Sequence, residues 1–131
     1  MSSNYLFVYG TLQKESDNEM SGFLTQYAKN IEEGYFLGRL YQISWFPGAV
    51  FTGVASEKVF GTVFQVQHMS LVLKTLDAYE GFDEKRLESS LFVRQLITVY
   101  LENNRPLKAW VYLYNQTVKG KRRIDSGYFI E

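Results

Sequence analysis

The segment Tyr5–Leu12 reads YLFVYGTL and decides the fold more than any other stretch of the chain. Its first five residues are apolar or aromatic, which is typical of a β-strand because such side chains suit a pleated, half-buried surface. Gly10 interrupts the run, and glycine lets a backbone approach a ligand closely. Successive N–H groups in such a turn can hold an anion. The segment predicts a strand followed by a candidate loop for a carboxylate or phosphate, with a plain strand-ending turn as the alternative.

Downstream of this segment, short apolar runs punctuated by glycines and turn residues predict further strands. Internal glycines in strands often mark bends or bulges, which a barrel needs at its corners. The last two strands are joined by a turn at residues 102–105, and alternate residues of the final strand share one face. The predicted strands cover residues 34–43, 49–51, 59–66, 91–101 and 107–114.

Two helices are predicted between these strands. The first follows Ser16, which has capping-box spacing with Glu19, and its apolar residues recur at helical intervals: Phe23, Leu24, Tyr27, Ala28 and Ile31. The second covers residues 71–79, with Ser70 as its N-cap and Gly81 as its stop. The order is strand, helix, strands, helix and hairpin. It indicates an α+β fold rather than regular βαβ alternation.

Composition narrows the classes of function. The 131 residues are expected to form a single domain over residues 1–131. The chain has 14 basic and 14 acidic residues, so its net charge attracts neither nucleic acid nor an anionic membrane. The chain has no cysteine, which excludes disulfides, thiolate zinc sites and cysteine nucleophiles. Its one histidine is His68, so a metal site made of several histidines is excluded within one chain. We expect a cytoplasmic protein, since there is no signal-peptide pattern and no long apolar run.

Glu80 is the candidate catalytic residue. On the second predicted helix, Leu73, Leu76 and Glu80 fall at i, i+3 and i+7 and share the apolar face. Asp77 is expected on the outer face. Burial and the partial negative charge of a helix C-terminus would both raise the pKa of the Glu80 carboxyl group, which suits a general acid/base near neutral pH. The alternative is a glutamate at a frayed helix end, reaching into water beside Gly81.

Several other polar residues are weaker candidates. Arg94 interrupts an apolar strand. Three interpretations are open: its side chain lines a cavity, pairs with an acid, or faces outward from a half-exposed strand. Tyr41, Tyr112 and Tyr114 are candidates to offer hydroxyl groups to a pocket, although most tyrosines at strand spacing serve packing. The basic residues between 119 and 123 are interpreted as a solvated, mobile segment rather than a nucleic-acid site, because the net charge is zero.

These segments together resemble the gamma-glutamyl cyclotransferase-like family in its compact bacterial form. The similarity extends over nearly the whole chain and depends on the order and spacing of the motifs rather than on any one of them. The most specific pair is the YGTL loop and the segment around Glu80. The matching segments are YLFVYGTL (5–12), GRLY (38–41), FPGA (46–49), VFGTVFQV (59–66), LDAYEGF (76–82), FVR (92–94) and AWVY (109–112).

The resemblance implies a small mixed-strand β-barrel with a few packed helices and a pocket at one mouth. It implies that a gamma-glutamyl amine or amino acid binds with its α-carboxylate on the loop formed by Tyr9, Gly10, Thr11 and Leu12. Glu80 would then act as the acid/base that releases 5-oxoproline and a free amine. No metal or organic cofactor is implied. We expect Tyr41, Arg94 and Tyr114 to contribute to substrate binding, and the protein to be a monomer or a weak homodimer.

The chain departs from the family pattern at three places. Phe92 stands where tyrosine is expected, Gln13 follows the YGTL loop where a basic residue is common, and residues 125–128 only loosely match the closing motif. These departures bear on substrate identity. Two alternatives to the simple cyclotransferase remain. One is an enzyme that removes a gamma-glutamyl group from a larger amine, and the other is a non-catalytic small-molecule-binding or interaction domain on the same fold.

Overall fold

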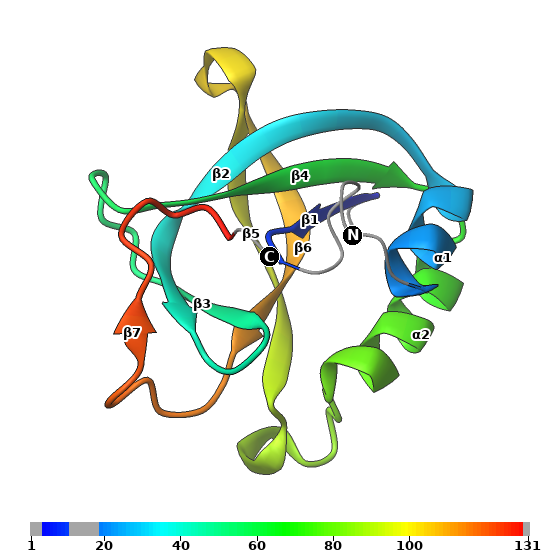
Figure 1. The fold of residues 1–131 in the computed structure, drawn as a ribbon. Helices are drawn as coiled ribbons and strands as arrows, with labels where there is room; N and C mark the ends of the chain where they lie inside the picture. The colour runs from blue at the N-terminus through cyan, green and yellow to red at the C-terminus, as the bar shows by residue number, and fades with distance from the viewer. Residues whose placement is uncertain (1–3, 11–18, 130–131) are drawn as a thin grey trace.

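The computed structural model describes residues 4–10 and 19–129. Two helices lie together against one side of a strongly curved sheet (Figure 1). The helices are α1 (Glu19–Tyr27) and α2 (Met69–Glu80), and the short 3₁₀ segments are Leu87–Ser89 and Glu102–Asn104. The strands are β1 (Tyr5–Val8), β2 (Ala28–Gln42), β3 (Pro47–Phe51), β4 (Lys58–Val66), β5 (Phe92–Leu101), β6 (Pro106–Tyr114) and β7 (Arg122–Arg123).

Five strands close into a barrel. Their order is β2-β4-β1-β6-β5, and β5 returns to β2 through the pairs Gly34–Leu101 and Tyr35–Tyr100. The β1–β6 pairing is parallel, whereas the other pairs are antiparallel. β3 and β7 pair with β2 outside this ring. The predicted α+β class and small mixed-strand barrel are therefore confirmed.

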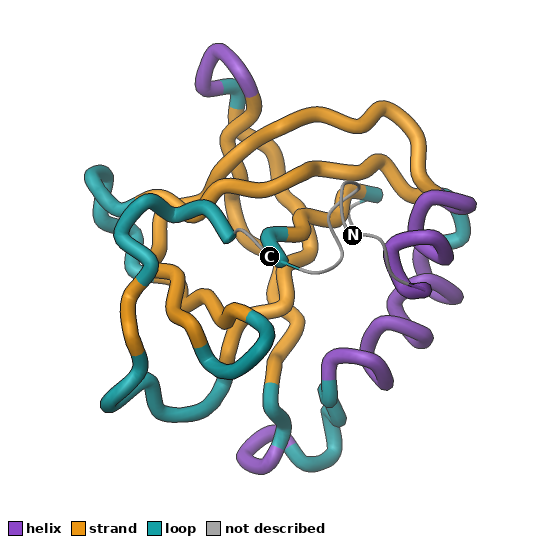
Figure 2. Tube along the Cα trace, in the orientation of Figure 1, coloured by secondary structure: helices purple, strands orange, loops and turns teal. Residues whose placement is uncertain are grey.

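Alternation along the strands divides the apolar side chains into two layers. On β1, Phe7 packs inside the barrel, whereas Leu6 and Val8 pack with residues of the two helices. On β6, Ala109 and Val111 belong to the interior layer, as the sequence pattern predicted. The helices cover only one side of the barrel (Figure 2), so the second layer lies between barrel wall and helices. This arrangement brings the end of α2 close to the ends of several strands.

Two predicted boundaries are wrong. The first helix ends at Tyr27, so Ala28 and Ile31 belong to β2 rather than to the helix. Ala28 pairs with Val66 of β4, and this long-range pairing overrides the local helical spacing. The proposed capping residue Ser16 lies outside the described residues.

The second helix begins two residues earlier than predicted, at Met69 instead of Leu71. His68, not Ser70, is the residue before the helix, and it adopts a left-handed backbone conformation with φ 55°. Its carbonyl accepts the N–H of Val72 at 3.1 Å, which closes the first turn. Within residues 4–10 and 19–129, no helix has both the length and the apolar character needed to cross a membrane.

Candidate functional site

A cavity of about 180 Å³ lies where β1, β5 and α2 meet the turn before β3. Its wall is mostly apolar and aromatic, and Glu80 is the single charged side chain among the described residues that line it. The lining residues are Phe7, Val8, Tyr9, Gly10, Trp45, Phe46, Pro47, Tyr79, Glu80, Leu91, Phe92 and Tyr112. A mostly apolar wall with one converging polar group is typical of a small-molecule site.

Glu80 reaches this cavity from the last turn of α2. Leu73 and Leu76 are buried on the same helix and hold that face inward. The helix stops at Gly81, which has φ 70° and donates to the carbonyl of Ala78, as the sequence predicted. Glu80 is partly buried rather than fully in water. Burial raises the pKa of its carboxyl group to about 7, so both protonation states are accessible near neutral pH.

Tyr9 connects three strands at the cavity. Its hydroxyl group donates to the carbonyl of Tyr112 at 2.6 Å and accepts the N–H of Ala49 at 3.1 Å. Burial raises the pKa of this phenol, and the negative charge of Glu80 raises it further. The hydroxyl is therefore held neutral and committed to two backbone groups. Tyr9 contributes its ring to the cavity and fixes the strand that leads into Gly10.

Gly10 lies against Pro47 in the cavity wall. A Cβ atom added at Gly10 would come within 2.8 Å of the Cγ atom of Pro47, which is closer than such atoms approach in folded proteins. The close approach of these two segments therefore requires glycine. The sequence predicted that glycine here lets the backbone approach a ligand, and that stays a prediction.

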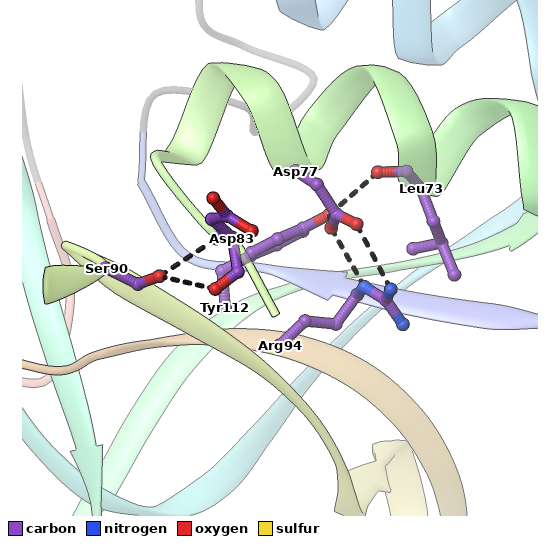
Figure 3. Close-up of polar contacts among 6 residues, drawn as sticks. All are labelled: Leu73, Asp77, Asp83, Ser90, Arg94 and Tyr112. Carbon is purple, nitrogen blue, oxygen red and sulfur yellow. Dashed lines mark hydrogen bonds and ion pairs between the residues drawn. The ribbon is translucent and has the colours of Figure 1, made fainter. Parts of the chain in front are cut away.

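Asp77 is the centre of a polar network beside the cavity (Figure 3). Arg94 donates to its two carboxylate oxygens at 2.9 and 3.1 Å, and the Tyr112 hydroxyl group donates to it at 2.6 Å. The Arg94 guanidinium also lies over the rings of Trp110 and Phe82, at 4.8 and 5.5 Å from their centroids. The network joins the last turn of α2 to β5 and β6. Arg94 therefore pairs with an acid, which was one of the options left by the sequence.

The prediction that Asp77 lies on the outer face of its helix is wrong. Asp77 is four residues after the buried Leu73, so it projects beside the apolar face instead of away from it. Its side chain is partly buried by Arg94 and Tyr112. The apolar stripe of α2 is therefore bordered by two carboxylates. Glu80 borders the cavity, and Asp77 borders the barrel wall.

The connection from α2 to β5 is fixed by backbone and side-chain hydrogen bonds. The N–H of Leu91 donates to the carbonyl of Gly81 at 3.0 Å. The Ser90 hydroxyl group accepts the N–H of Asp83 at 2.9 Å and lies 3.1 Å from its carbonyl (Figure 3). These bonds tie the end of the helix to the start of β5.

The structure brings three predicted site residues together: Tyr9, Gly10 and Glu80. Thr11 and Leu12 lie outside the described residues. Tyr41, Arg94 and Tyr114 are not among the described residues of the cavity wall.

The three residues outside the wall have other partners. Tyr41 is opposite Gly48 and Arg123, so part of the basic segment near the C-terminus forms the short strand β7 instead of only solvated chain. The ring of Tyr114 packs edge-on against Phe92 at 5.6 Å.

Sequence reasoning missed most of the apolar wall. Its residues come from three separate parts of the chain, namely the turn before β3 (Trp45 and Phe46), the end of α2 (Tyr79) and the residue before β5 (Leu91). No local sequence pattern indicates that these parts meet. The position of Tyr79 next to Glu80 was the one available signal. In the part of the chain that the structure describes, no cluster of three or more His, Cys, Asp or Glu residues is arranged to hold a metal ion.

The fold and the site together define a barrel protein with a mostly apolar cavity in which Glu80 is the carboxylate among the described lining residues. A sequence profile of the family described as gamma-glutamyl cyclotransferase, AIG2-like, matches residues 6–131. The chain therefore belongs to this family. It is 29% identical over 126 residues to the gamma-glutamylcyclotransferase family protein ytfP of Citrobacter rodentium, a match that covers 96% of this chain and 95% of that protein.

Solved structures show the same fold. YkqA from Bacillus subtilis matches with a TM-score of 0.71 at 24% identity over 98% of this chain. That match covers 40% of YkqA, so the chain spans less than half the length of that protein. The solution structure of ytfP from Escherichia coli matches with a TM-score of 0.61 at 25% identity, over 97% of this chain and 96% of that one. Family membership supports a gamma-glutamyl cyclotransferase-like function in broad terms.

Proposed function

We propose that this protein is a gamma-glutamyl cyclotransferase that releases 5-oxoproline and a free amine from a gamma-glutamyl amine or amino acid. The observation that carries the proposal is Glu80: a partly buried carboxyl group, with its pKa raised to about 7, in a small cavity beside Gly10. A group with a pKa near the working pH can both accept and donate a proton. The cyclotransferase reaction requires both transfers.

The proposed reaction begins with the substrate's α-carboxylate at backbone N–H groups of the segment that begins at Gly10. The ionised Glu80 accepts a proton from the α-ammonium group, and the freed amine attacks the substrate's own γ-carbonyl carbon. A new C–N bond closes the five-membered ring. The carbonyl electron pair moves to the oxygen as this bond forms and returns as the bond between the γ-carbon and the departing nitrogen breaks, while Glu80 gives its proton to that nitrogen. The Glu80 carboxylate that results takes the second proton of the ring nitrogen, which leaves the single N–H of 5-oxoproline and a neutral amine. Because the attack is intramolecular, correct positioning supplies much of the rate.

Replacing the carboxyl group by an amide tests the proposal. Glu80→Gln keeps the shape but cannot accept the ammonium proton, so we expect 5-oxoproline release to fall by about 10²–10⁴-fold. Glu88→Gln is the matched control, because Glu88 is an exposed carboxylate on the nearby connection to β5. It should retain turnover, and both variants should remain folded in melting curves. A Glu80→Gln protein within a few-fold of wild type would remove Glu80 from the mechanism.

A further inference from the structure

The outer part of the cavity is exposed and apolar. Trp45 is 70% exposed, Tyr79 40% and Leu91 37%, and all three line the cavity that contains Glu80. Together with the partly buried Phe46 they form what we call the apolar rim. Grouped exposed apolar side chains on a folded surface usually mark a binding site, since single exposed residues of this kind are normally scattered.

Hydrogen bonds hold the apolar rim in place. The turn before β3 is closed by the N–H groups of Ile43 and Ser44, which both donate to the carbonyl of Phe46, at 3.1 and 3.2 Å. Trp45 is at the tip of this turn, and its ring packs edge-on against that of Phe46 at 5.1 Å. The backbone of Leu91 is bonded on both sides, to Gly81 and to Asn115. An incoming apolar group would therefore meet a rigid surface, which reduces the entropy lost on binding.

The charges around the cavity indicate which kind of departing amine suits the apolar rim. Glu80 is the charged group among the described lining residues, and no described lysine or arginine lines this cavity. Lys121 contacts the turn through the carbonyl of Ile43 and is not part of the wall. A departing amino acid would place its own carboxylate against apolar rings in the cavity that also holds the Glu80 carboxylate, where a second negative charge is costly to desolvate. An uncharged aromatic or aliphatic substituent would instead bury apolar area against Trp45.

We propose that the apolar rim binds the amine half of the substrate and favours aromatic or other apolar substituents on the departing nitrogen over small or charged ones. This inference rests on the proposed cyclotransferase function. It assigns the substituent on the departing nitrogen to the surface formed by Trp45, Phe46, Tyr79 and Leu91. The gamma-glutamyl half lies deeper, between Glu80 and Gly10.

The test compares two substrates on three proteins. Gamma-glutamyl-phenethylamide and gamma-glutamyl-glycine share the glutamyl half and differ in the departing amine. In wild type we expect kcat/KM for the phenethylamide to exceed that for the glycine compound by about ten- to a hundredfold, the range that one apolar pocket can discriminate. Trp45→Ala should raise KM for the phenethylamide about tenfold and raise KM for the glycine compound by much less, because the smaller departing group buries little area against the ring. Phe51→Ala, at an exposed position outside the cavity, should change neither.

The outcomes separate this inference from the proposed function. Turnover of both compounds with equal or better use of gamma-glutamyl-glycine overturns the selectivity and leaves the cyclotransferase intact. Equal effects of Trp45→Ala on both substrates also overturn it. If wild type releases 5-oxoproline from neither compound nor from any other gamma-glutamyl amine, the proposed function fails and the selectivity fails with it. Preference for the phenethylamide that is lost only in Trp45→Ala supports the assignment.

Discussion

Near neutral pH, the protonated and ionised forms of the Glu80 carboxyl group have similar free energies. Burial raises its pKa to about 7 from the 4.5 of a solvated glutamic acid. The proposed mechanism begins with the ionised form. We therefore expect kcat/KM for 5-oxoproline release to rise with pH through a midpoint near 7. A pH–rate profile of wild type measures this directly, and a profile that is flat between pH 5 and 8 would contradict it.

The same shift makes a prediction about stability. Because the folded-state pKa of Glu80 is raised, the folded protein binds more protons than the unfolded chain between pH 4.5 and 7, and stability is lost as pH rises through that window. The full effect is at most about 3 kcal/mol. Glu80→Gln cannot ionise, so its melting temperature should exceed that of wild type above pH 7 and match it near pH 4. An identical pH dependence for the two proteins would show that Glu80 titrates as an ordinary solvated group.

At the scale of elements, the last turn of α2 is held by the ion pair between Asp77 and Arg94. Asp77→Asn removes the charge that Arg94 faces and weakens the bond from the Tyr112 hydroxyl group. We expect about 1–3 kcal/mol lower stability, since the pair is only partly buried. Turnover should fall about tenfold, because small displacements of a catalytic group are costly. Stability comes from denaturant titration, and turnover from the 5-oxoproline assay.

Two readouts identify Asp77 as a positioning residue rather than an acid/base. The midpoint of the pH–rate profile should stay near 7 in Asp77→Asn, because Glu80 is retained. Arg94→Lys keeps the charge but loses the two-pronged geometry, so its turnover should lie between wild type and Asp77→Asn. A loss as large as that of Glu80→Gln, accompanied by a shifted pH midpoint, would instead place Asp77 in the proton transfers.

The helix α2 shows what local sequence can and cannot predict. Its stop at Gly81 and the inward position of Glu80 follow from spacing and capping rules, and the structure confirms them, whereas its start lies two residues before the predicted one. The position of Asp77 was predicted wrongly. Leu73 and Leu76 show which face of the helix is buried, but they do not show how far the buried surface extends around the helix. That depends on the residue that packs against Asp77. That partner is Arg94, which is 17 residues away in the sequence and on another element. Borders of a helical face are set by tertiary contacts.

At the scale of the whole molecule, the barrel depends on contacts that no local pattern contains. β2 pairs with β5 across a separation of more than 60 residues, and the parallel β1–β6 pair joins Leu6 to Trp110. The sequence predicted six of the seven strands that the structure describes and missed β7 and the first part of β2. The barrel followed from the resemblance to the family. The cavity wall is assembled from separate segments along β1, the turn before β3, α2, β5 and β6. The apolar rim could not be predicted from the sequence, because its residues become neighbours only when the strands pair into the closed barrel.

Tyr9 is the residue at which closure of the barrel can be tested. Its hydroxyl group links β1 to the backbone of Tyr112 on β6 and of Ala49 on β3, all in buried surroundings. Tyr9→Phe keeps the ring in the cavity but leaves a carbonyl and an N–H group without this partner. Unpaired buried polar groups cost about 1–3 kcal/mol each, so we expect the melting temperature to fall by several degrees. Tyr128→Phe removes a hydroxyl group from an exposed ring and should leave the melting temperature unchanged. Unchanged stability would show that the hydroxyl group does not hold the barrel together.

Because the Tyr9 ring remains in the cavity wall, turnover by the folded Tyr9→Phe protein at low temperature should stay within about tenfold of wild type. A loss of turnover as complete as that of Glu80→Gln, in a protein that is still folded, would show that the Tyr9 hydroxyl group takes part in the reaction itself.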